Sequence, residues 1–344
     1  MGYRNFRHLV GWQAGLLVLA MVGGCSSAGG GGQPDVELTL VSFAVTKSAH
    51  DAIIPKFVEK WQREKGQRVR FKQSYGGSGS QTRAVVDGLK ADVVHLALGS
   101  DVAKIEQSGL IQPGWEQELP NGAIVSKSVA AIVRRDGNPK GIQDWADLAK
   151  PNIKWITADP KTSGVARWNF LALWQSAVKA GFDDAKALEF VGKAYGNVPI
   201  LTKDAREATD VFFKQGQGDA LVNYENEVLF AQSKGTKVDY VVPKVNISID
   251  NPIAVVDKNV DAKGTREVAE AFTQYLFSPE AQAEFAKVGF RPVDATVANN
   301  PENQSKYPKI DALATVKNFK GWPEIQKKFF ADGAAFDQIQ AQKK

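Results

Sequence analysis

An alternation of strand patterns and helix patterns constrains the fold of this chain more than any other feature. Apolar residues alternate over 36–43, recur with helical spacing over 53–61 and alternate again over 69–71. A short helical segment over 81–89 and an apolar strand over 92–98 continue the order. This β-α-β-α-β succession predicts an α/β fold in which helices cover a parallel sheet.

The same alternation returns in the rest of the chain. Strands are predicted at 129–133, 155–157, 198–201, 220–222 and 253–256, and helices at 166–180, 206–214, 265–277 and 279–287. A chain of 344 residues is long enough for two cores, so we expect two lobes. The first would hold residues 36–122 and 253–344, and the second residues 123–252. The two crossings between them, near 122–128 and 246–252, would form a two-segment hinge that permits closure on a ligand.

The composition excludes several classes of protein. Apolar residues make up 43% and charged residues 24%, which is typical of soluble globular domains. The net charge of +5 is scattered without a block of Lys or Arg, so no nucleic-acid partner is expected. Cys25 is the single cysteine, which excludes disulfides within the chain and CxxC redox or zinc sites. The sequence predicts no metal site and no cofactor.

The N-terminus has the pattern of an export signal. Arg4 and Arg7 precede an uncharged stretch over 9–24, which is shorter than the roughly 20 residues that span a bilayer as a helix. This pattern predicts a secretory signal peptide over 1–24. Its end, Val22-Gly-Gly-Cys25, resembles a bacterial lipobox, in which the cysteine carries the lipid; a plain secretory signal is the alternative. Residues 25–35 would form a flexible tether, and the protein would be anchored outside the cytoplasm by lipid on Cys25.

Four loops follow predicted strands, at 73–80, 159–165, 202–205 and 223–227, and the first three also precede predicted helices. In open α/β sheets, ligands bind beyond the carboxyl ends of the strands. The first amides of each following helix have no partner in the helix and carry the positive end of its dipole, so they hold anions well. Each loop alone has an ordinary structural explanation. Together they predict a cleft lined by amides, the hydroxyls of Ser78 and Ser163, and the phenol of Tyr224.

Eight motifs indicate a resemblance to a known family. They are Gln73-Ser-Tyr-Gly-Gly-Ser-Gly, Ala91-Asp-Val-Val-His-Leu-Ala-Leu, Gly137-Asn-Pro-Lys, Ile142-Gln-Asp-Trp, Ala166-Arg-Trp-Asn, Tyr224-Glu-Asn-Glu, Lys263-Gly-Thr and Arg291-Pro. The sequence resembles the sulfate-binding proteins of bacterial ABC importers, and their thiosulfate-binding relatives, over nearly the whole mature chain. The resemblance implies a type II-like periplasmic-binding fold, in which a monomer closes on one dianion and delivers it to a permease with its ATPase.

The resemblance also implies a set of ligand contacts. Carried over by position, the amide donors are Ser78, Gly164, Val165 and Ala205. Ser163 would donate its hydroxyl and Tyr224 its side chain. Four further residues would support the site without direct contact: Gly77, Gly79, Arg167 and Arg206.

Three positions depart from the pattern of the family. Relatives carry Trp where this chain has Tyr224, some carry an acidic residue where it has Ala44, and some carry Gly where it has Val165. A phenol can donate a hydrogen bond but can also accept one. These departures leave ligand preference open.

A site made only of donors favours sulfate, because sulfate is fully deprotonated near neutral pH and only accepts hydrogen bonds. Thiosulfate, molybdate and phosphate remain alternatives as ligands, and so does a surface lipoprotein without a transport role. A serine hydrolase fits poorly. The run Gly76-Gly-Ser-Gly-Ser80 misses the GxSxG pattern at its last position, and His95 lies inside an apolar strand.

Overall fold

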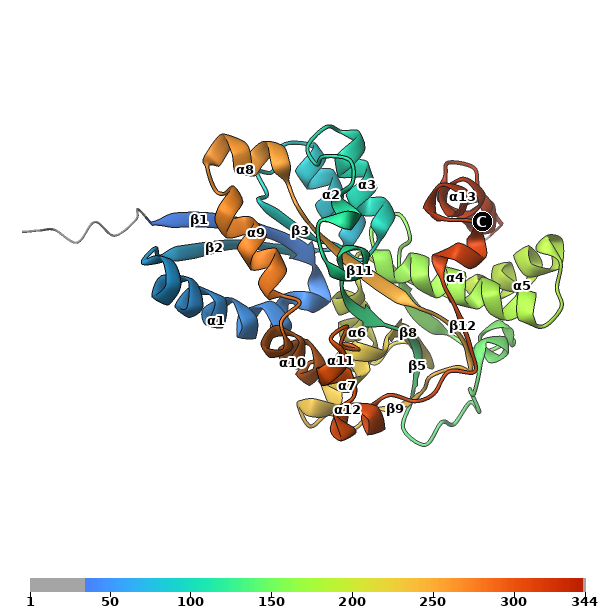
Figure 1. Ribbon diagram of the computed structural model, residues 1–344. Coiled ribbons are helices and arrows are strands. Elements are labelled where there is room, and N and C mark those ends of the chain that lie inside the picture. The colour runs from blue at the N-terminus through green and yellow to red at the C-terminus, as the bar shows by residue number, and fades with distance from the viewer. Residues whose placement is uncertain (1–34, 343–344) are drawn as a thin grey trace, which may run out of the picture. The chain divides into compact units, whose positions relative to one another are not determined.

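The computed structural model describes residues 35–342 (Figure 1). The predicted signal peptide, Cys25 and nearly all of the tether lie outside these residues. Within the described part, none of the helices has the length and apolar character needed to cross a bilayer.

The first sheet has five strands in the order β2-β1-β3-β11-β4. These are β2 (Val69–Gly76), β1 (Val36–Phe43), β3 (Val93–His95), β11 (Ile249–Val255) and β4 (Ile124–Ser128). β1 runs parallel to β2 and β3, but β11 is antiparallel to both β3 and β4. The predicted parallel arrangement is confirmed for β1, β2 and β3, whereas the antiparallel β11 makes the sheet as a whole mixed. β11 runs the other way because it enters from the second sheet instead of following a crossover helix of its own.

The second sheet also has five strands, in the order β7-β6-β8-β5-β9. These are β7 (Leu201–Thr202), β6 (Trp155–Ala158), β8 (Ala220–Tyr224), β5 (Ala130–Arg134) and β9 (Asp239–Val241). β6 is parallel to β7 and β8, so their carboxyl ends meet at one edge. β5 is antiparallel to its neighbours on both sides.

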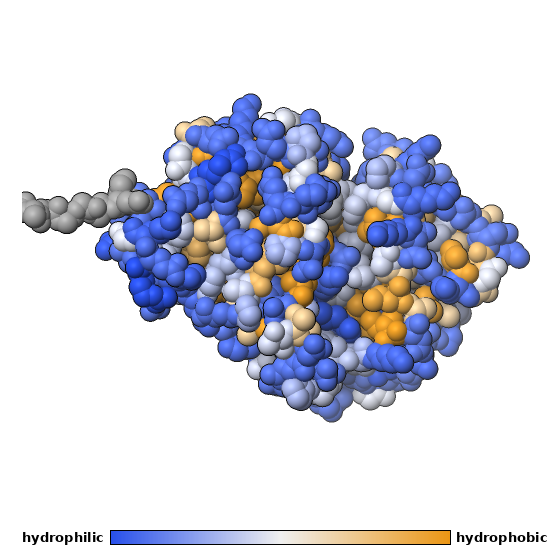
Figure 2. Space-filling view, viewed as in Figure 1, coloured by the Kyte–Doolittle hydropathy of each residue, from blue (hydrophilic) through white to orange (hydrophobic). Residues whose placement is uncertain are grey.

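Helices accompany both sheets (Figure 1). The first sheet has α1 (Lys47–Lys65), α2 (Ser78–Val86), α3 (Gly99–Gln107), α8 (Asp257–Lys263), α9 (Arg266–Tyr275) and α10 (Pro279–Lys287). The second has α4 (Gly164–Lys179), α5 (Asp184–Gly196), α6 (Ala205–Phe213) and α7 (Glu225–Ser233). Hydrophilic residues cover most of the face seen in Figure 2, and the large apolar side chains pack inside.

Three segments run between the two sheets. β4 ends at Ser128 and β5 begins at Ala130, so the first passage is at Val129. The second leads from β9 through β10 (Val245–Ile247) to β11, and the third leads from α10 to the C-terminal tail through β12 (Ala312–Ala314), which pairs with β10. The prediction of two crossings thus missed the third. The short β12 strand has no periodic pattern by which to recognise it.

The C-terminal tail packs on the helices of the second sheet. It follows α11 (Ala295–Ala298) and α12 (Pro301–Lys306), and contains α13 (Trp322–Ile325) and α14 (Ala335–Ala341). The Trp322 ring lies 5.0 Å from that of Trp168, and the Phe336 ring lies 5.8 Å from that of Tyr195. The limits of the two lobes stay a prediction, and these contacts lead us to expect the tail to move with α4 and α5.

Two of the family motifs stabilise the first sheet. Asp92 is fully buried, and its carboxylate accepts hydrogen bonds from the Thr265 hydroxyl at 2.8 Å and the Thr39 amide at 2.6 Å. Lys263 pairs with the same carboxylate. A buried charge is stable only when it is paired in this way. Asp92, Lys263 and Thr265 therefore have a structural role.

Candidate functional site

The four predicted loops lie at the carboxyl ends of β2, β6, β7 and β8, where each is followed by a helix. Ser78, Gly164 and Ala205 are the first residues of α2, α4 and α6, and Tyr224 directly precedes α7. α2 therefore begins three residues earlier than predicted. One loop comes from the first sheet and three from the second.

Contacts join these loops to one another. The Ser80 amide donates to the Thr162 carbonyl at 3.3 Å, which links α2 to the loop before α4. The Thr162 hydroxyl donates to the Lys203 carbonyl at 2.8 Å. The Asn223 side chain donates to the Ala205 carbonyl at 2.9 Å. The structure thus brings all four predicted loops together across the two sheets, which is the arrangement of a closed cleft.

Glycines permit this close approach. A Cβ atom added to Gly77 would lie 2.5 Å from the Thr162 carbonyl oxygen and 2.8 Å from that of Lys203. One added to Gly79 would lie 3.3 Å from the Thr162 oxygen. Gly77 has φ of −62°, which any residue can adopt. Its lack of a side chain therefore serves contact between the loops and not an unusual backbone conformation.

Four predicted donor amides are available for a ligand. Ser78, Gly164 and Ala205 each occupy the first position of a helix and Val165 the second, so their amides have no partner within the helix. Over residues 35–342, none of these amides donates to another protein group. Val165 has a negative φ and lies in α4. Having Val here, where some relatives carry Gly, therefore leaves the amide in helical geometry. The helix dipoles add positive potential at the same place.

Two buried hydroxyls complete the donor set. Ser163 precedes α4, but its side chain does not cap that helix. Tyr224 is 1% exposed, and its ring lies 6.1 Å from that of Phe43. Neither hydroxyl has a hydrogen-bond partner within the described part of the chain. Burial, and then the charges of Glu227 and Asp101, raise the pKa of Tyr224 well above its ordinary value, so the phenol remains a protonated donor.

The hydroxyl of Ser78 has a different role from the one predicted. It donates to Asp101 Oδ2 at 2.6 Å and accepts from the Ala97 amide at 3.0 Å. The prediction that both serine hydroxyls line the cleft is therefore wrong for Ser78, which can offer only its amide. Sequence reasoning missed Asp101, although it lies in the first turn of α3, directly after the apolar strand predicted at 92–98.

Two arginines lie behind the donors. Arg167 is buried, its Nη1 lies 3.5 Å from Asp101 Oδ1, and its Nε donates to the Pro160 carbonyl at 2.8 Å. Arg206 Nη2 lies 3.0 Å from Glu227 Oε1. Burial raises the pKa of Glu227 to about 7, and the charge of Arg206 opposes that rise. Both guanidinium groups therefore face carboxylates.

The acidic residues of the second and third loops, Asp159 and Asp204, use their carboxylates locally. Asp159 Oδ1 accepts from the Lys161 amide at 2.8 Å. Asp204 Oδ1 accepts from the Glu207 amide at 2.9 Å and caps α6. A cavity of about 610 Å³ opens beside these loops, and its lining includes Tyr75, Lys203 and Arg206.

The side-chain hydrogen bonds of His50 and His95 within the described residues go to one another, to Tyr75 and to Ser126, and not to the predicted site residues Ser78 and Ser163. His50 Nε2 and His95 Nδ1 are 3.1 Å apart, and His50 Nδ1 lies 3.1 Å from the Tyr75 hydroxyl. Both rings are fully buried, and burial lowers the pKa of His50 to about 3. Within residues 35–342, no cluster of three or more His, Cys, Asp or Glu side chains could hold a metal ion.

The structure has two mixed β-sheets, each with its own helices, and crossing segments connect them. The N-termini of helices from both sheets come together at the predicted site. This arrangement is that of a two-lobed binding protein of the periplasmic class. The sequence model for bacterial extracellular solute-binding proteins matches residues 38–291. The chain is 57% identical over 329 residues to a sulfate-binding protein of Synechococcus elongatus, covering 95% of this chain and 93% of that protein. It is 38% identical over 318 residues to a thiosulfate-binding protein of Pseudomonas aeruginosa, covering 90% and 94%. Among solved structures, the sulfate-binding protein SubI of Mycobacterium tuberculosis matches with a TM-score of 0.78 and 35% identity, over 86% of this chain and all of that one.

The chain therefore belongs to the family of bacterial extracellular solute-binding proteins. This membership agrees with the predicted fold class and with a place outside the cytoplasm. The relatives named above are binding proteins and not enzymes.

Proposed function

We propose that this protein captures sulfate outside the cytoplasm and delivers it to an ABC importer. The observation that carries the proposal is the meeting of unpartnered amides from α2, α4 and α6 with the free hydroxyls of Ser163 and Tyr224. Every one of these groups can donate a hydrogen bond, and only the two hydroxyls can also accept one. The sulfate-binding relatives, at up to 57% identity, support the same ligand.

The chemistry of the donors explains the choice of anion. Sulfate needs only donors, whereas monohydrogen phosphate carries a proton that needs an acceptor. Two buried carboxylates lie near these donors. Asp101 is engaged by the Ser78 hydroxyl and lies beside Arg167, and Glu227 pairs with Arg206 at 3.0 Å. A phosphate proton would therefore face an amide, or a hydroxyl that must accept instead of donating to the anion, and such a buried mismatch costs about 1–3 kcal/mol.

Titration calorimetry of the mature body with sulfate, thiosulfate, molybdate and phosphate tests this proposal. We expect saturable sulfate binding at pH 7–8, with phosphate weaker by at least about fivefold. Equal competition by phosphate would reject the argument from donors. If thiosulfate binds more tightly than sulfate, the argument from hydrogen-bond donors stands, but thiosulfate replaces sulfate as the proposed ligand.

Tyr224→Phe is expected to weaken sulfate binding by about ten- to a hundredfold. The change removes one hydrogen bond to a charged ligand, worth roughly 1.5–3 kcal/mol. Calorimetry measures the loss directly. Tyr195→Phe is the matched control, since the Tyr195 hydroxyl is also buried and has no hydrogen-bond partner in the described part of the chain. Unchanged affinity in Tyr224→Phe would remove this phenol from the site.

We also propose that Cys25 carries a lipid anchor and that the loaded protein, as a monomer, docks on a permease with its ATPase. The lipobox pattern around Cys25 supports the anchor. Mass spectrometry of the mature N-terminus, with Cys25→Ala as control, tests lipidation. Loss of sulfate uptake on deletion of the gene would support the transport role, and unchanged uptake would favour a surface lipoprotein without one.

A further inference from the structure

We infer that the ion pair between the buried Glu225 and the partly buried Arg291 is a positioning device that holds Tyr224 in place for the bound anion. Both residues belong to family motifs, but neither is among the predicted ligand contacts, so the proposed function does not explain their role. The inference rests on the proposed function, because it concerns the same site.

The pair acts on the residue directly after Tyr224. Glu225 is the first residue of α7 and is fully buried. Its carboxylate accepts from Arg291 Nε at 2.7 Å and from Arg291 Nη2 at 2.9 Å, which is the bidentate geometry that fixes both partners. Any displacement of Glu225 would also shift the phenol of Tyr224.

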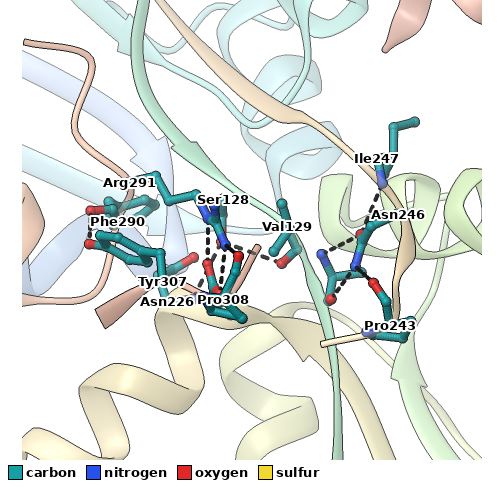
Figure 3. A network of polar contacts seen from close by, with 12 residues as sticks. Ser128, Val129, Asn226, Pro243, Asn246, Ile247, Phe290, Arg291, Tyr307 and Pro308 are labelled. Atoms are coloured by element: carbon teal, nitrogen blue, oxygen red, sulfur yellow. Dashed lines mark hydrogen bonds and ion pairs between the residues drawn. The ribbon is translucent and has the colours of Figure 1, made fainter. Parts of the chain in front are cut away.

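The start of α7 is attached to the first crossing segment as well. The Glu225 amide donates to the Val129 carbonyl at 2.8 Å, and the Asn226 amide donates to the Ser128 hydroxyl at 3.4 Å. Figure 3 shows Arg291, Ser128 and Asn226 together at this crossing. The position of Tyr224 therefore depends on the first crossing segment, around which the two sheets would rotate.

Arg291 itself belongs to the first sheet. Its amide donates to the Lys127 carbonyl of β4 at 2.8 Å. It follows α10, in which Gln282 donates to the Val125 carbonyl of β4 at 2.9 Å. The ion pair thus joins the first sheet to α7 of the second.

The packing leaves little room for these elements to slide. Gly289 has φ of +90°, and a Cβ atom there would lie 2.8 Å from the Asn226 carbonyl oxygen and 2.8 Å from Leu229 Cβ. Arg291 lies over the Tyr307 ring at 5.0 Å and donates to the Pro308 carbonyl at 3.3 Å. Burial raises the pKa of Glu225 and Arg291 opposes that rise, so the carboxylate depends on its partner.

A double-mutant cycle on sulfate affinity tests the inference. Arg291→Lys keeps the charge but loses the bidentate fork. We expect it to weaken sulfate binding about tenfold. In the same background, Tyr224→Phe should cost less than about threefold, instead of the ten- to hundredfold expected alone, because the phenol is already misplaced. A purely structural role would leave the cost of Tyr224→Phe unchanged.

Arg134→Lys is the matched control. Arg134 also pairs with a carboxylate, through Nε and Asp239 Oδ1 at 3.0 Å, but both residues lie within the second sheet. It should leave sulfate affinity and the cost of Tyr224→Phe as in the wild type. If Arg291→Lys does not fold, as judged by circular dichroism, Glu225→Gln takes its place in the cycle.

The outcomes separate the two proposals. Wild-type protein that does not bind sulfate would reject the proposed function and this inference with it. Wild-type protein that binds sulfate, with the full Tyr224→Phe cost retained in the Arg291→Lys or Glu225→Gln background, would overturn this inference alone.

Discussion

Gly77→Ala is expected to weaken sulfate binding by about five- to 150-fold while the free protein stays folded. The added methyl group would lie 2.5 Å from the Thr162 carbonyl oxygen and 2.8 Å from that of Lys203, and both are backbone atoms that cannot rotate away. Overpacking of this kind costs about 1–3 kcal/mol. The cost falls on the closed form, because Gly77 and Thr162 belong to loops from different sheets.

Calorimetry with sulfate and thermal unfolding without it measure the two effects. Alanine suits the backbone of Gly77, whose φ and ψ are −62° and 134°, so the melting temperature of the free protein should change little. Gly196→Ala is the matched control, since nothing lies within 4 Å of a Cβ atom at that position. Wild-type affinity in Gly77→Ala would mean that the loops need not meet when sulfate binds.

Asn246→Ala is expected to lower the free energy of unfolding by about 2–5 kcal/mol. The Asn246 side chain is fully buried between two crossing segments (Figure 3). Its Nδ2 donates to the Ala130 carbonyl at 2.8 Å, and its Oδ1 accepts from the amides of Ala130 at 3.1 Å and Ile247 at 2.9 Å. Removing it leaves buried backbone groups without partners, at about 1–3 kcal/mol each before relaxation.

Urea unfolding monitored by circular dichroism measures this loss. Asn299→Ala, at an exposed position, is the control and should change stability by less than about 0.5 kcal/mol. A stability loss in Asn246→Ala no larger than in the control would show that water replaces the side chain at the crossing.

Local patterns predicted many of the elements. The predicted bounds of α10, 279–287, are those observed. In the structure Ser278 caps this helix and Pro279 occupies its first position, which fixes where it begins. β1 was predicted in the same way from its alternation. By contrast, the strand predicted at 92–98 is only Val93–His95. Leu96 still donates its amide to the Pro252 carbonyl of β11 at 2.9 Å, but Ala97 and Leu98 lie in a buried bend before α3. A continuous apolar run marks burial but not hydrogen bonding to a neighbouring strand.

The sequence by itself determined the α/β class, the four loops after strands and, through the resemblance, the family. These depend on patterns within about ten residues, which the chain displays directly. Only the tertiary structure decided the direction of β11, the third crossing, the engagement of the Ser78 hydroxyl by Asp101 and the pairing of Glu225 with Arg291. These join residues up to 162 positions apart along the chain (Val93 and Val255), and which distant groups meet depends on how the whole chain packs.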